Sequence, residues 1–194
     1  MKVLIFTDTH GSERAIRKLK QKAKGVDAVI CAGDISIFEE GMTRLLSQLN
    51  KFKVPVFMIH GNHEDKGDLE RACSRFKNIK FIHNKSISLD DIIFLGYGGG
   101  GFVKKDPVFE KAMNKFKNLK GKRFVLITHA PPYDTKLDEL MEGHCGNASI
   151  RKFIEQFKPE VAVSGHIHEN DGKTDYIGKT KVINPGYKGK IISL

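Results

Sequence analysis

The feature that most constrains the fold of this chain is a set of five short polar runs, nearly all of which directly follow a strand-like stretch. The runs hold imidazole, carboxylate and side-chain amide groups, and five of the eight histidines fall in them. Groups so far apart in the sequence can meet only if the ends of the strands meet, as the carboxyl ends do in open α/β sheets. The runs are Asp8-Thr9-His10, Gly33-Asp34, Gly61-Asn62-His63-Glu64, Thr128-His129 and Gly165-His166-Ile167-His168.

The first half of the chain alternates apolar strands with amphipathic helices. Continuous apolar runs of this kind are typical of strands that are covered on both faces. Ser12 can cap the first helix and Gly25 can close it. Alternation of this kind implies a parallel sheet with right-handed crossovers. The expected strands are residues 2–7, 28–32 and 54–59, and the expected helices are residues 12–24, 39–50 and 68–76.

The pattern changes in the second half, where short strands follow one another quickly. Asp90-Asp91 forms a tight turn between two of them, Asn147 can cap a helix over residues 149–157, and Pro159 ends that helix. Two sheets packed face to face, with helices outside, would fit this order. The other expected elements are strands at 79–82, 86–89, 92–97, 123–128 and 161–164, a helix at 107–119, and hairpin strands at 174–177, 180–183 and 190–193.

In their order and type, the five runs resemble the motifs of the calcineurin-like metallophosphoesterases. Each run alone is weak evidence, but all five together are strong evidence. The resemblance extends from residue 7 to residue 168, and Val182-Ile183-Asn184-Pro185-Gly186 is similar to the family's C-terminal end. It implies a four-layer α/β sandwich of two mixed sheets flanked by helices, with residues 1–194 forming a single domain.

The resemblance also implies a dinuclear metal site in which every ligand position of the family pattern is filled. Two divalent ions about 3.5–4 Å apart can clamp the attacking and leaving oxygens of a phosphoryl displacement, and they lower the pKa of bound water. One ion would be held by Asp8, His10 and His168, the other by Asn62, His129 and His166, and Asp34 would bridge the two. Nitrogen and oxygen ligands without thiolate suit Mn, Fe, Co, Ni or Zn. The resemblance favours Mn or an Fe/Zn pair, with Mn as the expected activator.

Two residues of the third run are expected to act in catalysis. His63 would donate a proton to the leaving alkoxide or stabilise charge on the phosphoryl oxygens. Glu64 stands where many relatives carry Asp, and an acidic group there could orient the imidazole and raise its pKa. The expected reaction is hydrolysis of phosphoesters, chiefly small phosphodiesters, by a metal-bound hydroxide. The alternatives are a nuclease of the same family, whose members are usually longer, and a non-catalytic scaffold, some of which lack this histidine.

The composition of the chain limits which binding partners and which cellular location are expected. The net charge is +10, but the lysines are scattered and the chain has no Trp and four Tyr, so nucleic acid is a possible partner that is not favoured. A small phosphoester is the expected substrate, and the oligomeric state is open. No apolar run approaches the ~20 residues that span a bilayer. Three cysteines without paired spacing indicate free thiols and a cytoplasmic location.

Several groups outside the five runs remain open to more than one interpretation. His60 and His83 are expected to be structural. His144 lies in a glycine-rich loop before a helix, where backbone N–H groups could approach a phosphate, so a substrate role is an alternative. Tyr133 is expected to border the substrate pocket. Gly98–Gly101 could be a flexible substrate loop or a tight passage of backbone. Cys145 is expected to pack without another role, and a role as a soft metal ligand is the minor alternative.

Overall fold

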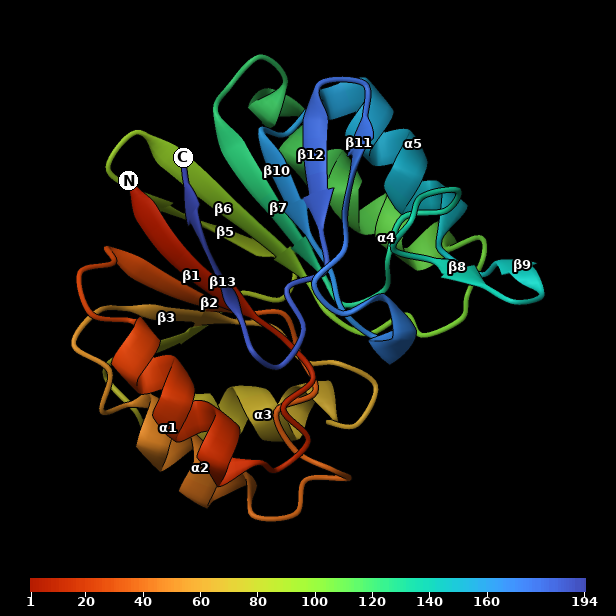
Figure 1. The fold of residues 1–194 in the computed structure, drawn as a ribbon. Helices are drawn as coiled ribbons and strands as arrows, with labels where there is room; N and C mark the ends of the chain where they lie inside the picture. Colours follow the sequence, from red (N-terminus) through yellow and green to blue (C-terminus); the bar gives the residue numbers. More distant parts are fainter.

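The computed structural model describes all 194 residues and confirms the predicted α/β sandwich of two mixed sheets flanked by helices (Figure 1). Helices α1 (Glu13–Lys22), α2 (Met42–Leu49) and α3 (Lys66–Cys73) cover the outer face of the first sheet. Helices α4 (Pro107–Met113) and α5 (Ala148–Phe157) cover the outer face of the second sheet. The four layers are therefore helix, sheet, sheet and helix.

The first sheet has five strands in the order β13-β1-β2-β3-β4. Strands β1 to β4 are parallel to one another, and β13 is antiparallel to β1. The alternating strand and helix pattern of the first half of the chain produces this parallel arrangement. Each helix carries the chain back to the end of the sheet where the previous strand began, so the next strand runs in the same direction. The bounds are β1 (Lys2–Phe6), β2 (Ala28–Cys31), β3 (Val56–Met58), β4 (Ile79–Phe81) and β13 (Lys190–Ser193).

The second sheet has six strands in the order β11-β12-β10-β7-β6-β5. Its four central strands are parallel, and its two edge strands, β11 and β5, are antiparallel to their neighbours. The bounds are β5 (Lys85–Leu89), β6 (Ile92–Tyr97), β7 (Phe124–Thr128), β10 (Val161–Val163), β11 (Thr174–Ile177) and β12 (Thr180–Ile183).

Two expectations about the chain's second half need correction. The last strand, β13, does not form a hairpin with β12 but leaves the second sheet and pairs with β1 of the first. The expected loop around His144 contains a small hairpin, β8 (Glu139–Leu140) with β9 (Gly143–His144). Both differences concern which strand pairs with which, and short-range patterns carry little information about that.

Helices α1 and α5 begin where their capping residues predict, whereas α1 ends at Lys22, before the expected Gly25. The Ser12 side chain accepts a hydrogen bond from the backbone N–H of Ala15, and the Asn147 side chain accepts one from Ile150. Lys158 caps the C-terminal end of α5 in the left-handed conformation, directly before the proline. The expected helix at 107–119 divides into α4 and a 3₁₀ helix, η1 (Asn114–Leu119), and a second 3₁₀ helix is η2 (His168–Asn170). No helix combines the length and the apolar character needed to cross a membrane.

Each sheet buries both of its faces, because alternate side chains point to opposite sides of a strand. In β1, Val3 and Ile5 lie in the layer between the two sheets, where Phe94 of the second sheet also packs. Leu4 and Phe6 point the other way, into the core beneath the first three helices. This packing aligns the two sheets so that the carboxyl ends of their parallel strands meet at one edge.

Candidate metal centre

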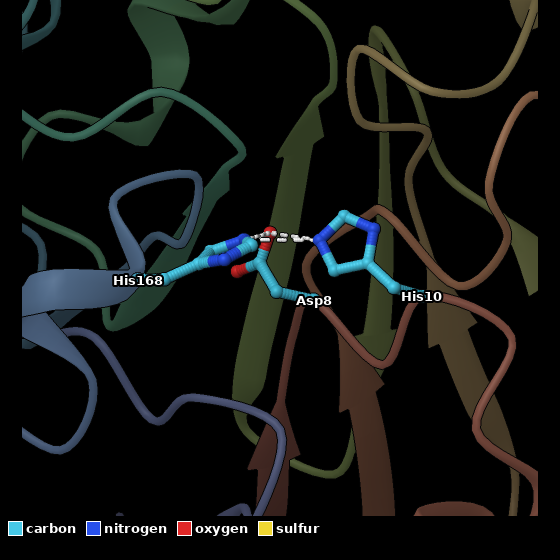
Figure 2. Close-up of side chains that lie close together, drawn as sticks. All are labelled: Asp8, His10 and His168. Atoms are coloured by element: carbon cyan, nitrogen blue, oxygen red, sulfur yellow. Dashed lines mark hydrogen bonds and ion pairs between the residues drawn. The ribbon is translucent and has the colours of Figure 1, made fainter.

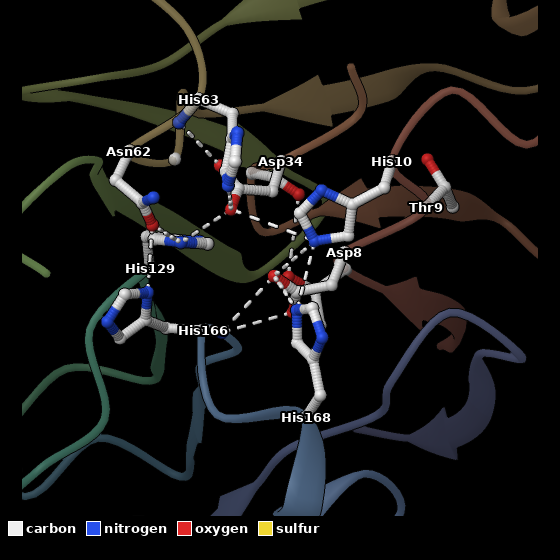
Figure 3. A network of polar contacts seen from close by, with 12 residues as sticks. Asp8, Thr9, His10, Asp34, Asn62, His63, His129, His166 and His168 are labelled. Carbon is white, nitrogen blue, oxygen red and sulfur yellow. Dashed lines mark hydrogen bonds and ion pairs between the residues drawn. The ribbon is translucent and has the colours of Figure 1, made fainter. Parts of the chain in front are cut away.

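The predicted site residues gather at the edge where the parallel strands of the two sheets end (Figure 3). Asp8 and His10 follow β1, Asp34 follows β2, and Asn62 and His63 follow β3. From the second sheet, His129 follows β7, and His166 and His168 follow β10. The structure thus brings together all seven predicted metal ligands and His63, as the strand order requires.

The first set of donor atoms comes from Asp8, His10 and His168 (Figure 2). The Nε2 atoms of His10 and His168 face each other at 2.9 Å. Asp8 Oδ1 lies 3.8 Å from Nε2 of His10 and 3.6 Å from Nε2 of His168. Asp8 is itself held in place, because its carboxylate accepts a hydrogen bond from the backbone N–H of His166 at 3.1 Å.

The second set comes from Asn62, His129 and His166. Asn62 Oδ1 lies 3.0 Å from Nε2 of His129 and 2.8 Å from Nδ1 of His166. The other ring nitrogen of His129, Nδ1, is 2.9 Å from the backbone carbonyl of Ala32 and donates to it. This contact orients the ring so that Nε2 faces the site, as such carbonyl partners do for metal-binding histidines.

Asp34 lies between the two sets. Its Oδ2 is 3.4 Å from Nε2 of His129 in the second set and 4.0 Å from Nε2 of His10 in the first. Its Oδ1 accepts a hydrogen bond from the backbone N–H of His63 at 3.0 Å, which fixes the carboxylate's orientation. One oxygen therefore faces both donor sets.

The geometry and chemistry of these groups fit two divalent cations. Nitrogen and oxygen ligands lie about 2.0–2.2 Å from a metal ion, so neighbouring ligand atoms are roughly 3–3.5 Å apart. The separations between 2.8 and 4.0 Å within the two sets lie close to that range. Asp8 and Asp34 are 6% and 2% exposed, and buried carboxylates require a compensating positive charge.

His129 and Asp34 shift each other's pKa values. Burial opposes ionisation of Asp34, but the hydrogen bond and charge of His129 outweigh it and lower the pKa of Asp34 to about 2. Burial likewise opposes a charge on His129, and the Asp34 carboxylate outweighs that effect and raises the pKa of His129 to about 9. Burial lowers the pKa of His10, and it lowers that of His166 to about 4. A lowered pKa favours the neutral imidazole, which is the form that binds metal ions.

The backbone at the site adopts a sparsely populated conformation. Asp8, His10, Asp34 and His166 have φ values of 53°, 43°, 51° and 71°, all in the left-handed region. Such a conformation costs roughly 1–2 kcal/mol per residue, and Asp and His tolerate it better than most side chains. Strain of this kind clusters at functional sites, where it aims side chains that a regular strand would point elsewhere.

Two glycines of the motifs leave space for the carboxylates. A Cβ atom at Gly61 would lie 1.9 Å from Oδ1 of Asp34, and a Cβ atom at Gly165 would lie 2.3 Å from Oδ2 of Asp8. No other residue type can occupy these positions without displacing a candidate ligand. The glycines therefore belong to the motifs for a steric reason.

Glu64 contacts different groups from those expected. It is 5% exposed, and its carboxylate accepts hydrogen bonds from the backbone N–H groups of Asp34 at 3.1 Å and Gly61 at 3.0 Å. It also accepts bonds from the N–H and hydroxyl of Ser36, both at 2.9 Å. No hydrogen bond joins it to the imidazole of His63. Glu64 thus ties the loop after β2 to the loop after β3 and does not orient His63 directly.

His63 lies beside the bridging carboxylate. Its Nε2 is 3.9 Å from Oδ2 of Asp34, and its ring centroid is 4.9 Å from that of His10. The side chain is 24% exposed, so its ring can meet a molecule that enters from solvent. Because His63, His10 and Asp34 also place ligand atoms within 4.8 Å of one another, the geometry by itself allows His63 to be either a ligand or a proton donor.

The remaining candidates lie outside these two sets. Nδ1 of His144 is 2.9 Å from Oδ1 of Asp138, which raises the pKa of the histidine, and the ring packs edge-on against Tyr133. His60 and His83 pack against each other and against aromatic rings. Cys145 donates its thiol hydrogen to the backbone carbonyl of Asp138. The rings of Phe38 and Phe102 touch His63 and His166. The sequence did not point to Phe38, whereas Phe102 directly follows the glycine run that was expected to border the substrate.

Known proteins resemble this chain over most of its length. The family model described as calcineurin-like phosphoesterase matches residues 1–170. The uncharacterized protein MJ1162 of Methanocaldococcus jannaschii is 32% identical over 99% of this chain and 91% of its own length. TT1561 of Thermus thermophilus superposes with a TM-score of 0.80 and 16% identity, covering 96% of this chain and 90% of that one. A dimetal phosphatase from Danio rerio superposes with a TM-score of 0.64 and 10% identity, over 94% and 86%.

Proposed function

The chain belongs to the calcineurin-like phosphoesterases, and on that premise we propose that it hydrolyses phosphoesters, small phosphodiesters above all, with two divalent cations. The observation that carries the proposal is the position of Asp34. Its Oδ2 lies 3.4 Å from His129 and 4.0 Å from His10, each of which belongs to a different donor set. A shared carboxylate oxygen between two sets of nitrogen and oxygen donors is the arrangement that a dinuclear site needs.

The proposed ligands of the first cation are Asp8, His10 and His168, and those of the second are Asn62, His129 and His166. Asp34 is proposed to contact both. When bound, the cations supply Lewis-acid activation of water and of the phosphoryl oxygens. The ligands contain no thiolate, so Mn, Fe, Co, Ni and Zn are all chemically suitable, and Mn is the proposed activator.

The protein's own groups divide the remaining work. His63 donates a proton to the leaving oxygen, for which its partly exposed ring beside Asp34 is well placed. Asp8 and Asp34 would hold the cations with their negative charge and are themselves oriented by backbone N–H groups. Glu64 positions the loops that carry Asp34 and Asn62. The net charge of +10 favours the approach of an anionic ester.

Metal analysis and a substrate panel test the proposal. Protein prepared with excess Mn²⁺ should contain near two equivalents per chain, and a firm stoichiometry of one or zero overturns the dinuclear assignment. The panel compares a simple phosphodiester, a phosphomonoester, cyclic nucleotides and single-stranded DNA at two salt concentrations. We expect the small diester to be cut at least as well as the monoester. Rapid DNA cleavage that weakens steeply with salt would favour a nuclease instead, and two bound metals without turnover would favour a scaffold.

A further inference from the structure

Two exposed phenylalanine rings lie against the candidate metal centre. Phe38 is 78% exposed, and its ring centroid is 4.8 Å from that of His63. Phe102 is 65% exposed, and its centroid is 4.5 Å from that of His166. In Figure 3, His63 and His166 lie on opposite sides of His129. The two phenyl rings therefore flank the centre at two separate places.

The loop that carries Phe38 is tightly held although its ring is not. Ser36, two residues earlier, is buried and bonded to Glu64, and the carboxylate of Glu39 accepts a hydrogen bond from the N–H of Asp65 at 2.8 Å. Phe38 itself has a φ of 44°, which is an outlier for a bulky residue. The protein therefore bears backbone strain to present an aromatic ring to solvent beside His63.

The loop that carries Phe102 is held by different contacts, and it too presents an exposed aromatic ring beside a histidine of the centre. The N–H of Gly99 donates to the carbonyl of His60 at 3.1 Å, and the carbonyl of Lys104 accepts from Ala148 at 2.8 Å. Gly99, Gly100 and Gly101 have φ values of 80°, 102° and 43°, which only glycine adopts at little cost. The glycine run thus bends the chain sharply after β6 and brings Phe102 onto the ring of His166.

Both rings are largely exposed, so contacts within the chain do not provide the free energy that burial of their apolar surface would give. Burying such a side chain is worth roughly 1.5–3 kcal/mol. A planar apolar group of a bound molecule could cover each ring by stacking, which is effective for any aromatic partner. Because both rings touch histidines of the centre, that molecule would be the substrate whose phosphorus lies at the centre.

We propose that Phe38 and Phe102 are specificity-determining residues that bind the two organic groups of an aryl or nucleoside-like phosphodiester. This inference rests on the proposed phosphoesterase function. Phe38 contacts the leaving group, since it packs on His63, the proposed proton donor. Phe102 contacts the group that stays on phosphorus. In the reaction water adds its oxygen to phosphorus and the P–O bond to the leaving group breaks. The leaving oxygen keeps the electron pair and takes a proton, which yields a monoester and a phenol or an alcohol.

A series of esters with one common leaving group separates the two roles. The substrates are bis(4-nitrophenyl) phosphate, methyl 4-nitrophenyl phosphate and 4-nitrophenyl phosphate, each assayed with Mn²⁺. For Phe102→Ala we expect kcat/KM to fall about 5- to 100-fold with the bis-aryl ester and to change little with the other two, since only the first has an aryl group to stack there. For Phe38→Ala we expect a similar fall with all three, because all three release nitrophenolate.

Binding supplies a readout that does not depend on turnover. Calorimetry compares diphenyl phosphate with dimethyl phosphate as ligands of the same Mn²⁺-loaded proteins. Each alanine variant should weaken diphenyl phosphate binding and leave dimethyl phosphate binding unchanged. The Phe38→Tyr and Phe102→Tyr variants keep a ring and should behave like the wild type. Met141→Ala, which removes a fully exposed side chain on the β8–β9 hairpin, is the matched control for loss of an exposed apolar group.

The outcomes that overturn the inference are distinct from those that overturn the function. If Phe102→Ala affects the methyl and aryl diesters equally while two metals remain bound, there is no aryl subsite at Phe102. If both alanine variants leave the diphenyl to dimethyl binding ratio unchanged, the rings serve another contact, such as a protein partner. If the wild type turns over none of the three esters but shows the expected binding ratios, the proposed function fails and the subsites stand.

Discussion

The molecule contains two clusters of histidines that differ in what surrounds them. The metal-site cluster consists of His10, His63, His129, His166 and His168 with the Asp8 and Asp34 carboxylates. The aromatic cluster consists of His60, Phe81, His83 and Tyr97, with ring centroids of neighbouring members 4.6–6.3 Å apart. His60 precedes Asn62 by only two residues, yet it belongs to the second cluster.

The difference shows that the neighbours of an imidazole decide its chemistry. His129 is fully buried, but the Asp34 carboxylate raises its pKa to about 9. His60 is almost as deeply buried and faces rings, so burial lowers its pKa to about 3. The ring of His83 accepts a hydrogen bond from the N–H of Gly98 at 2.9 Å, and its pKa falls to about 4, chiefly through burial. The aromatic cluster therefore stays neutral and packs.

Asp34→Asn should have the largest effect on metal content and turnover. The substitution removes the charge that faces both donor sets, so both cations lose an anionic ligand. We expect metal content well below two equivalents and a loss of kcat/KM that exceeds the roughly 10²–10³-fold cost of removing one electrostatic group. Metal analysis by mass spectrometry and assay with a simple diester measure both effects. Two tightly bound metals in this variant would show that Asp34 does not bridge.

His63→Gln should separate proton transfer from metal binding within the metal-site cluster. We expect the variant to keep both cations and to lose about 10²–10⁴-fold in turnover, as expected for removal of a general acid. The loss should be smaller with a nitrophenolate leaving group, which needs little protonation, than with an alkyl leaving group. His166→Gln is the reference for a ligand, and equal metal loss in the two variants would make His63 a ligand.

Glu64→Gln should have a smaller effect that excess metal reverses. The amide group would face the N–H donors of Asp34 and Gly61, which now bond to the carboxylate, so the loops that carry Asp34 and Asn62 would shift. We expect cation affinity to fall about 10- to 100-fold, as for other groups that orient ligands, with kcat near normal at saturating Mn²⁺. Glu64→Asp, which keeps the charge, is the control. A low kcat at saturating metal would instead give Glu64 a direct part in catalysis.

Acid should weaken the fold through the aromatic cluster. His60 and His83 have lowered pKa values when folded, so below pH 6.5 the unfolded chain takes up protons that the folded chain does not. The free energy of unfolding therefore falls as pH drops from 6.5 toward 4, by about 1.4 kcal/mol per pH unit for His60. Urea denaturation of metal-free protein at pH 7, 6 and 5 measures the slope.

The matched variant for that measurement is His83→Gln, whose carbonyl can still accept the hydrogen bond from Gly98. It should show a shallower loss of stability with acid than the wild type. It should also keep two metals and normal turnover, which is the smallest effect expected of any histidine change. Identical slopes for the two proteins would show that His83 is not kept neutral by its surroundings.

Most helices and strands, and the place where the candidate site residues gather, follow from local features of the sequence. Apolar runs and caps such as Ser12 and Asn147 predict where strands and helices begin, because burial patterns and capping hydrogen bonds act over a few residues. Polar residues directly after parallel strands predict one shared edge, and the seven proposed ligands and His63 do lie together there. The order of strands and helices was sufficient to predict this, because neighbouring parallel strands joined by helices have their carboxyl ends on the same side of the sheet.

Which strands pair and which side chains touch depends on the tertiary structure. Strand β13 looks like part of a C-terminal hairpin, but it pairs with β1 because that partner lies at the open edge of the first sheet. Glu64 bonds to the N–H groups of Asp34 and Gly61, and Phe38 covers His63. Most of these partners are far apart in the sequence: β1 and β13 lie at opposite ends of the chain, and Glu64 follows Asp34 by 30 residues. No periodic pattern encodes such contacts. Which side chains meet is set by how the two sheets pack, and that depends on the whole core at once.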